Sequence, residues 1–311
     1  MAQLPTRALG DSGLEVSVVG LGCNNFGWRV DLEGARAVVD AALEQGVSFF
    51  DTADIYGGHG GSEQILGELL EGRRDQVVLA TKFGMDMGDG EARRGRRDYV
   101  LHSIEGSLRR LRTNVIDVYW LHQPDPETPI TETLGALDEL VRAGTVRAIG
   151  ASNFSSAQID EADAAAREHG FSRFSAIQNE YSLLKRQAER EVLPTCERLG
   201  LGFVPYYPLA SGLLTGKYTR GGDPPADARL SGRAQIASDG QFRLLEALQR
   251  YASERGISMT TVAIGALLAR SLVSSVIAGA TRPEQVGENA AAARWDPSDA
   301  DLQELEQLLA T

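Results

Sequence analysis

Residues 49–57 read Phe49-Phe50-Asp51-Thr52-Ala53-Asp54-Ile55-Tyr56-Gly57, and this stretch decides the fold. An apolar run ends on a carboxylate, Asp51, and we expect the turn that follows to present Tyr56 in the open. Two later apolar runs end in the same way, since residues 77–81 are followed by Lys82 and residues 115–121 by His122. Parallel α/β proteins build active sites where their strands end. These four side chains are therefore predicted to meet at one edge of a parallel sheet.

Apolar runs alternate with helical stripes along most of the chain. The predicted strands are 16–22, 47–50, 77–81, 116–121, 146–150, 176–178, 203–205 and 276–277, and the predicted helices lie near 35–43, 65–70, 101–111, 134–141, 156–169, 185–198 and from 283 onward. The runs are nearly continuous, as in strands that are covered on both faces. Eight such units suit an α/β fold of the (β/α)8 TIM barrel type better than an open doubly wound sheet. No GxGxxG sequence follows the first strand, which also disfavours the open sheet.

A single barrel domain is predicted over residues 1–311, with a β-hairpin in 6–16 and an extra C-terminal helix at 302–309. Gly46 suits the position just after a helix, and Ser62 suits an N-cap. The long irregular segment 215–238 follows the seventh strand. A loop of that length in a compact domain is usually functional or disordered, so we expect it to lie over the active-site face.

The composition is that of a globular protein, with 42% hydrophobic and 24% charged residues. A formal net charge of −12 argues against nucleic acid or an anionic membrane as a partner. The N-terminus lacks an apolar signal region and no apolar run is long enough to span a membrane. Cys23 and Cys196 have neither metal nor CxxC spacing, which indicates buried thiols in a reducing compartment. A cytoplasmic location follows as the expectation. The arginine cluster at 93–97 is interpreted as a solvated loop.

The four strand-end residues could together reduce a carbonyl group. A free tyrosine has a pKa of about 10, and a nearby ammonium would lower it. Tyr56 could then donate a proton near neutral pH, with Asp51 as the partner that keeps Lys82 charged. His122 could place a carbonyl oxygen beside Tyr56. No metal cluster is expected, because the other histidines lie in a turn, on a helix and at a helix end.

Proton donation to a carbonyl needs a hydride at carbon, which a nicotinamide cofactor supplies. Ser152 and Asn153 follow the fifth predicted strand, and Gln178 closes the sixth; their side chains could hold a carboxamide. Tyr206 follows the seventh strand and could stack on the ring. After the eighth strand, residues 279–284 open a helix whose backbone N–H groups, with Arg282, would suit a phosphate. An ordinary capping box of Thr281 and Glu284 explains the same residues.

Taken in order, these pieces resemble the aldo-keto reductase family, from about residue 6 to residue 293. The matching pieces are Asp51-Thr52-Ala53-x-x-Tyr56-Gly57, Thr81-Lys82, Ser107-Leu108-Arg109-Arg110-Leu111, Asp117 with Leu121-His122, Gly150-x-Ser152-Asn153-Phe154, Gln178-Asn179-Glu180-Tyr181, Tyr206-Tyr207-Pro208-Leu209-x-x-Gly212, and Ile277-x-Gly279 with Glu288-Asn289. The features look more like the bacterial and channel-subunit branches than the mammalian steroid-reducing branch.

The resemblance implies a TIM barrel that reduces aldehydes or ketones with NADPH, with Tyr56 as general acid supported by Asp51, Lys82 and His122. Trp28, Tyr56 and His122 would border the substrate. The implied cofactor-binding residues are Gly22, Asp51, Ser152, Asn153, Gln178, Tyr206, Tyr207, Leu209, Ser211, Lys217, Gly279, Thr281, Arg282, Gln285, Glu288 and Asn289.

The chain departs from the family's commonest pattern at the phosphate end. Gly279 stands where a lysine is frequent and Gln285 where an arginine is frequent, although Arg282 and Lys217 could compensate. NADH therefore stays an alternative to NADPH. Tyr207 replaces the usual serine. The chain also ends soon after 302–309, so we expect an open substrate pocket.

Two other functions use the same residues. A Schiff-base aldolase would employ Lys82 as nucleophile. A non-catalytic, NADPH-bound sensor or accessory subunit would bind the cofactor without turnover. Neither the physiological substrate nor the oligomeric state follows from the sequence.

Overall fold

A computed structural model describes residues 4–223, 230 and 237–310 of the chain. Eight parallel strands form one sheet in the order β10-β3-β4-β5-β6-β7-β8-β9. The strands are β3 (Val19–Gly22), β4 (Phe49–Asp51), β5 (Val78–Phe83), β6 (Ile116–Leu121), β7 (Val146–Ser152), β8 (Ala176–Gln178), β9 (Gly202–Phe203) and β10 (Val276–Gly279). This sheet has the strand number and direction that the sequence predicts.

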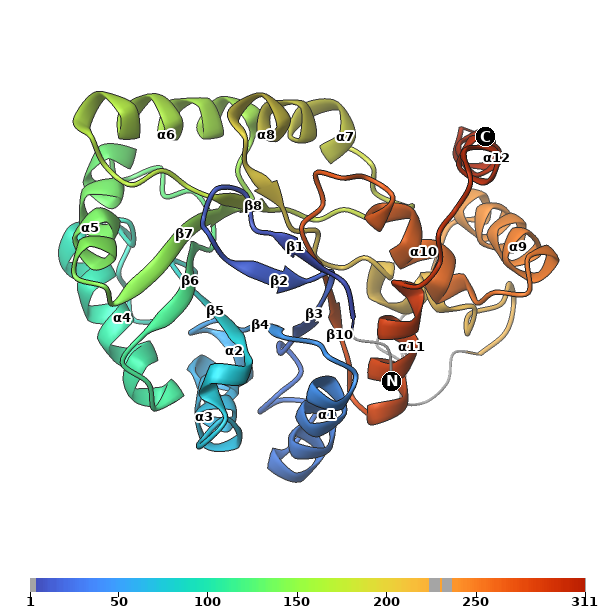
Figure 1. Cartoon of the computed structure of the whole chain (residues 1–311), viewed down its shortest axis with the longest axis horizontal. Coiled ribbons are helices and arrows are strands. Elements are labelled where there is room, and N and C mark those ends of the chain that lie inside the picture. The colour runs from blue at the N-terminus through green and yellow to red at the C-terminus, as the bar shows by residue number, and fades with distance from the viewer. Residues whose placement is uncertain (1–3, 224–229, 231–236, 311) are drawn as a thin grey trace.

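The sheet closes on itself between its first and last strands. The Ser274 amide donates to the Phe203 carbonyl at 2.9 Å, and the Ile277 amide donates to the Pro205 carbonyl at 2.9 Å. The helices lie around the outside of the strands (Figure 1). The molecule is therefore the predicted (β/α)8 barrel, with no open edge between β9 and β10.

The helices alternate with the strands as expected of βα units. They are α1 (Leu32–Glu44), α2 (Tyr56–His59), α3 (Gly61–Leu69), α4 (Arg97–Leu111), α5 (Ile130–Arg142), α6 (Ser156–His169), α7 (Ala188–Glu191), α8 (Leu193–Leu199), α9 (Asp239–Glu254), α10 (Met259–Leu268), α11 (Pro283–Ala292) and α12 (Asp299–Leu309), with the 3-10 turns η1 (Arg74–Gln76) and η2 (Ala210–Thr215). The predicted C-terminal helix is α12.

An antiparallel hairpin, β1 (Thr6–Ala8) and β2 (Glu15–Ser17), precedes the barrel and crosses it in Figure 1. Leu9, Leu14 and Val16 of the hairpin belong to the same buried cluster as the inward residues of the strands, among them Trp120. The hairpin therefore closes the N-terminal end of the barrel, which leaves the C-terminal strand ends as the open face.

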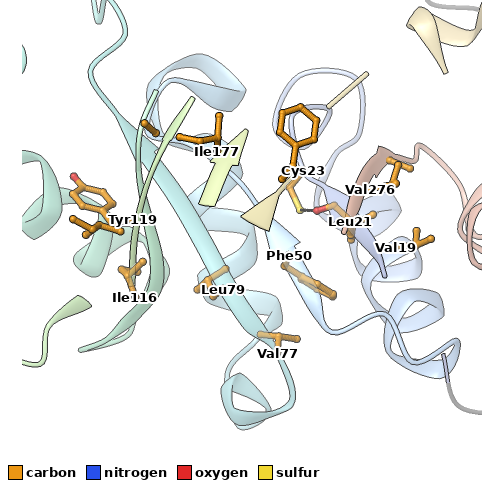
Figure 2. Close-up of a cluster of buried hydrophobic side chains, with 14 of the residues drawn as sticks. Val19, Leu21, Cys23, Phe50, Val77, Leu79, Ile116, Tyr119, Ile177 and Val276 are labelled. Carbon is orange, nitrogen blue, oxygen red and sulfur yellow. Dashed lines mark hydrogen bonds between the residues drawn. The ribbon is translucent and has the colours of Figure 1, made fainter. Parts of the chain in front are cut away.

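The opposite faces of the strands pack on the helices. Val19, Leu21, Phe50, Leu79 and Ile116 belong to this larger outer cluster, shown in Figure 2. Along β6 the two sets alternate, because Tyr119 lies in the outer cluster and Trp120 in the inner one. This period of two fixes which residues can point into the barrel. Trp120 is completely buried and thus part of the core.

Local signals account for the ends of several helices. The Asp31 side chain caps α1 by accepting from the Gly34 amide at 2.9 Å, and Gly46 follows that helix with a φ of 79°. Gly170 ends α6 in the left-handed conformation. Ser62 was predicted as an N-cap but lies inside α3, where its hydroxyl donates to the Cys23 carbonyl at 2.8 Å. That prediction is wrong, because Gly60 precedes the helix.

The structure corrects two further boundaries and adds two helices. The predicted strand 16–22 is two strands, since β2 ends at Ser17 and β3 begins at Val19. The predicted helix 185–198 is divided into α7 and α8, because Pro194 cannot donate the backbone bond that would continue α7. Helices α9 and α10 were not predicted at all. The predicted loop 215–238 includes residues 224–229 and 231–236, which lie outside the described residues.

None of the helices in the described part of the chain is both long and apolar enough to cross a membrane. No group of three or more histidine, cysteine or acidic side chains within 4–223, 230 and 237–310 could hold a metal ion. Cys23 and Cys196 are free and buried, as expected.

Candidate active site

The four predicted catalytic residues come from three neighbouring strands. Asp51 is the last residue of β4, Lys82 lies in β5, and His122 follows β6 directly, while Tyr56 begins α2 just beyond β4. The His122 amide donates to the Phe83 carbonyl at 2.8 Å, which holds the end of β6 against β5. The predicted convergence at the carboxyl edge is therefore confirmed, although Lys82 lies inside its strand and not past its end.

The Lys82 ammonium is the centre of the group. It donates to Asp51 Oδ2 and to the Thr52 carbonyl, the latter at 2.8 Å. The same nitrogen lies 5.1 Å from the centroid of the Tyr56 ring. A buried ammonium needs such acceptors, so the predicted pairing with Asp51 is confirmed.

Asp51 also joins the tetrad to the far side of the barrel. Its second oxygen, Oδ1, accepts from Gln178 Nε2 at 3.1 Å, and Gln178 is the last residue of β8. A continuous line of polar contacts thus runs across the mouth from Lys82 to Gln178. This line places a predicted catalytic carboxylate next to a predicted cofactor-binding amide.

Tyr56 is half-buried, not open to solvent as the sequence suggested. Burial first, and then the neighbouring Asp51 carboxylate, hold the pKa of the Tyr56 phenol well above its usual value. The expectation that Lys82 lowers the Tyr56 pKa is therefore wrong for the protein alone. The physical reason is that burial of the phenol and the Asp51 carboxylate outweigh the effect of the Lys82 ammonium. Tyr56 is consequently protonated, and able to donate, throughout the neutral range.

His122 faces Tyr56 edge-on. Their ring centroids are 5.7 Å apart and the ring planes are inclined by 82°. Burial, followed by the Lys82 ammonium, holds the pKa of His122 well below its usual value, so the imidazole is neutral and retains one N–H donor. Its buried Nδ1 has no hydrogen-bond partner among the described residues.

Asn153 links His122 to the nicotinamide-binding residues that the sequence predicts. Its side-chain amide donates to the His122 carbonyl at 2.9 Å and to Ser152 Oγ at 3.1 Å. Its oxygen accepts from the Tyr206 hydroxyl at 2.7 Å. Ser152 ends β7 and pairs in register with Gln178. The structure therefore brings Ser152, Asn153, Gln178 and Tyr206 together.

The predicted phosphate end gathers at β3, β10 and the start of α11. Gly22 and Gly279 end their strands opposite one another, and a Cβ on Gly22 would lie only 2.9 Å from the Ile277 side chain. Gln285 Oε1 accepts from the Thr281 amide at 2.8 Å. The alternative capping box of Thr281 and Glu284 is not formed, because Arg282 holds the N-cap position without a side-chain bond to the helix. Further along α11, Glu288 is exposed and Asn289 is buried.

Other predicted residues lie along the turn after β9. Tyr207 has a φ of 53° and Ser211 a φ of 58°, while Leu209 immediately precedes η2. The Lys217 ammonium lies 5.4 Å from the Tyr218 ring centroid. The side chain of Trp28, in the loop after β3, is 66% exposed.

The loop between β5 and α4 was interpreted as solvated, but one of its arginines is buried. Arg94 is 5% exposed, and its guanidinium donates to Asp86 at 2.8 Å and to Asp89 at 2.7 Å. It also donates to the Tyr99 hydroxyl at 2.7 Å. The prediction fails at Arg94, because two carboxylates of the same loop fold around this one arginine, whereas Arg93 and Arg97 are exposed as expected.

Sequence reasoning missed three residues at the mouth. Asn25, in the loop after β3, is 5% exposed and donates to the Ala280 carbonyl at 3.4 Å. Asn25 Oδ1 and Asn179 Oδ1 are buried without a hydrogen-bond partner in the described part of the chain. Thr52 contributes its carbonyl to Lys82. Thr52 and Asn179 follow a strand end directly and Asn25 lies three residues after one, so the rule that found Asp51 could have found the first two.

These unpartnered atoms test whether the mouth suits a nicotinamide dinucleotide. Buried acceptors on Asn25 and Asn179 and an unpartnered imidazole nitrogen on His122 offer polar contacts, and the two strand-end glycines present backbone without side chains. Such a set of amides, hydroxyls and open backbone suits a carboxamide, a ribose and a diphosphate. The residues present therefore fit the cofactor that the sequence implies.

Comparisons with known proteins agree over nearly the whole chain. The model of the Aldo/keto reductase family matches residues 18–310. An uncharacterized oxidoreductase of Bacillus subtilis, YrpG, is 39% identical over 89% of this chain and 87% of its own. A probable voltage-gated potassium channel subunit beta of Oryza sativa is 37% identical over 91% and 89%. The L-glyceraldehyde 3-phosphate reductase of Escherichia coli is 34% identical over 92% and 87%.

Proposed function

The chain belongs to the aldo/keto reductase family of oxidoreductases, and on that premise we propose that it reduces an aldehyde or ketone to the alcohol with hydride from NADPH. The observation that carries the proposal is the Lys82–Asp51 pair beneath Tyr56, with the neutral His122 facing the phenol. Tyr56 is proposed as the general acid.

In this reaction each side chain has a separate task. The bound nicotinamide supplies the hydride. Tyr56, held protonated, gives its proton to the substrate oxygen, and the neutral His122 donates a hydrogen bond that orients the carbonyl. The Lys82 ammonium stabilises the phenolate that Tyr56 leaves, and Asp51 keeps that ammonium in place.

Ser152, Asn153 and Gln178 are proposed to hold the carboxamide, with Tyr206 beside the ring. Asn153 is the key member, because it contacts both the His122 backbone and the Tyr206 hydroxyl. The segment from Gly279 to Asn289, with Gly22 and Asn25, would hold the adenosine half. Trp28 would border an open substrate pocket.

The contacts of Lys82 favour reduction over Schiff-base chemistry. A nucleophilic lysine must lose its proton, whereas this nitrogen donates to a carboxylate and to a carbonyl. Borohydride trapping with an aldehyde should accordingly leave Lys82 unmodified.

The similarity to a potassium channel subunit supports a second candidate function, that of a cofactor-bound accessory protein.

The test is oxidation of NADPH, followed by absorbance, with a panel of aldehydes and ketones that includes L-glyceraldehyde 3-phosphate, and NADH in parallel. Turnover with at least one carbonyl supports the reductase. Tight NADPH binding without turnover over the whole panel supports the accessory role. No binding of either nucleotide contradicts both.

A further inference from the structure

Asp54 lies two residues before Tyr56, and its side chain is only 3% exposed. Its amide donates to the Lys82 carbonyl at 3.1 Å, and the Tyr56 amide donates to the Ala53 carbonyl at 3.2 Å. The backbone that carries Asp54 and Tyr56 is thus anchored on the strand that carries Lys82. No step of the proposed reaction uses this second carboxyl group.

The Asp54 carboxyl faces a buried polar layer outside the barrel wall. The layer is continuous with the catalytic strand, because Thr81, the neighbour of Lys82, donates to Glu63 at 2.6 Å. The titratable groups that interact with the Asp54 carboxyl are Glu63 from α3, Arg110 and Tyr99 from α4, Arg94 from the loop before α4, Tyr119 from β6 and Tyr56 from α2.

Both arginines in this layer are bonded to other carboxylates. Arg110 Nε donates to Glu63 at 2.6 Å, and Arg94 is held by the two acids of its own loop. Asp54 Oδ1 has no hydrogen-bond partner among the described residues. An ionised carboxylate without a bonded counter-charge is unfavourable in such a place.

Tyr119 is a second buried group of this layer without a partner. Its ring packs on Phe83 with centroids 4.7 Å apart, and its hydroxyl is unpaired in the described part of the chain. Figure 2 shows Tyr119 on the helix-facing side of β6. Burial first, and then Glu63, raise the pKa of Asp54 to about 7, while Arg110, the Ile55 amide and Arg94 act in the opposite direction.

We propose, on the assumption that Tyr56 is the general acid, that Asp54 is a positioning residue whose buried carboxyl sets the acidity of Tyr56. An ionised Asp54 adds to the negative charge that raises the pKa of Tyr56, so the phenol becomes a weaker acid. A neutral Asp54 removes that charge and leaves the phenol a stronger acid. Carbonyl reduction should therefore slow as the pH rises through about 7.

The test compares wild type with Asp54→Asn, which has the same shape and cannot ionise. The rate constant kcat for NADPH-dependent reduction is measured from about pH 5.5 to pH 8.5. We expect the ratio of Asp54→Asn to wild-type kcat to rise by roughly threefold to tenfold over that range, with KM for the carbonyl unaffected by the change. Asp54→Glu, which can ionise, should restore the wild-type pH dependence. Asp138→Asn is the matched control, because Asp138 is 6% exposed and lies on α5.

A constant ratio of the two kcat values across this range would overturn the inference, since it would reduce Asp54 to a purely structural group. If Asp54→Asn does not fold, carbon-13 resonances of labelled aspartate carboxyls in the wild-type protein give the answer. One carboxyl must titrate near pH 7, and the absence of any such titration would also overturn the inference. Failure of the proposed function is distinguishable from failure of this inference. If Tyr56 were not the general acid, Tyr56→Phe would retain turnover whether Asp54 is ionised or neutral.

Discussion

The ammonium of Lys82 and the carboxylate of Asp51 form an ion pair at the floor of the barrel mouth, where their side chains are 1% and 5% exposed. A pair so deeply buried contributes little net stability, because desolvation offsets the attraction. Its value lies in geometry, since the paired ammonium is fixed 5.1 Å from the Tyr56 ring. Breaking the pair by removing one partner should therefore be far more harmful than removing both.

The variant Lys82→Met should lower the free energy of unfolding by about 3–5 kcal/mol, because it leaves the Asp51 carboxylate buried without a counter-charge. The double variant Asp51→Asn with Lys82→Met should recover a substantial part of that loss. Urea denaturation of the wild type, both single variants and the double variant gives the coupling free energy. Strictly additive effects would show that the two groups do not interact in solution.

The variant Tyr56→Phe should lower kcat for carbonyl reduction by about 10²- to 10⁴-fold, because the proton donor is lost while the ring remains. Binding of NADPH, followed by the quenching of tryptophan fluorescence, should survive. Tyr251→Phe is the control. Its hydroxyl donates to the Asp301 carbonyl at 2.9 Å, in the packing of α9 against α12, so that variant should lose stability and keep its turnover. Full activity in Tyr56→Phe would exclude this tyrosine as the acid.

The neutral state of His122 makes folding sensitive to acid. The folded protein holds the His122 pKa well below its usual value, whereas the unfolded chain titrates at about 6.5. Below that pH the imidazole is protonated in the unfolded chain but stays neutral in the folded protein. The free energy of unfolding therefore falls by up to about 1.4 kcal/mol per pH unit until the pH reaches the pKa of the folded state.

Denaturation curves of His122→Asn and wild type between about pH 4.5 and pH 7.5 test this relationship. The wild type should lose stability relative to His122→Asn as the pH falls. His102→Asn provides the comparison, because His102 is exposed on α4 and its replacement should leave the pH dependence as it was. If the free energies of unfolding of wild type and His122→Asn changed in parallel with pH, the imidazole of His122 could not be neutral and buried in the folded protein.

The convergence of Asp51, Lys82 and His122 could be predicted because it depends only on chain order. Each follows or ends an apolar run, and parallel strands bring such ends to one edge. The pairing of Lys82 with Asp51 was also predicted, and the structure contains it. The acidity of Tyr56 could not be predicted, because it depends first on how deeply the phenol is buried and then on the carboxylates around it, which only the folded mouth shows.

Register and long-range burial account for the other errors. Lys82 lies within β5 because that strand pairs with β6 as far as Phe83 opposite Leu121, which the residue pattern does not reveal. Arg94 is buried because Asp86 and Asp89 surround it, and arginine-rich loops are usually solvated. Helix α9 did carry a signal, since Ser238 and Gln241 form a capping box.

The variant Gly279→Lys should strengthen the preference for NADPH over NADH. Gly279 ends β10, and a Cβ there would make ordinary contacts of 3.4 Å with Asn25 and 3.6 Å with Asn24, so the backbone need not move. A lysine at this position would add a positive charge at the proposed phosphate end, and we expect the ratio of NADH to NADPH dissociation constants to rise about tenfold at low salt. The gain should shrink with added salt, because exposed charges are screened. Gly279→Ala is the control, because it adds a side chain without a charge. If Gly279→Ala and Gly279→Lys changed the ratio of dissociation constants equally, the 2′-phosphate of NADPH would have to lie away from the end of β10.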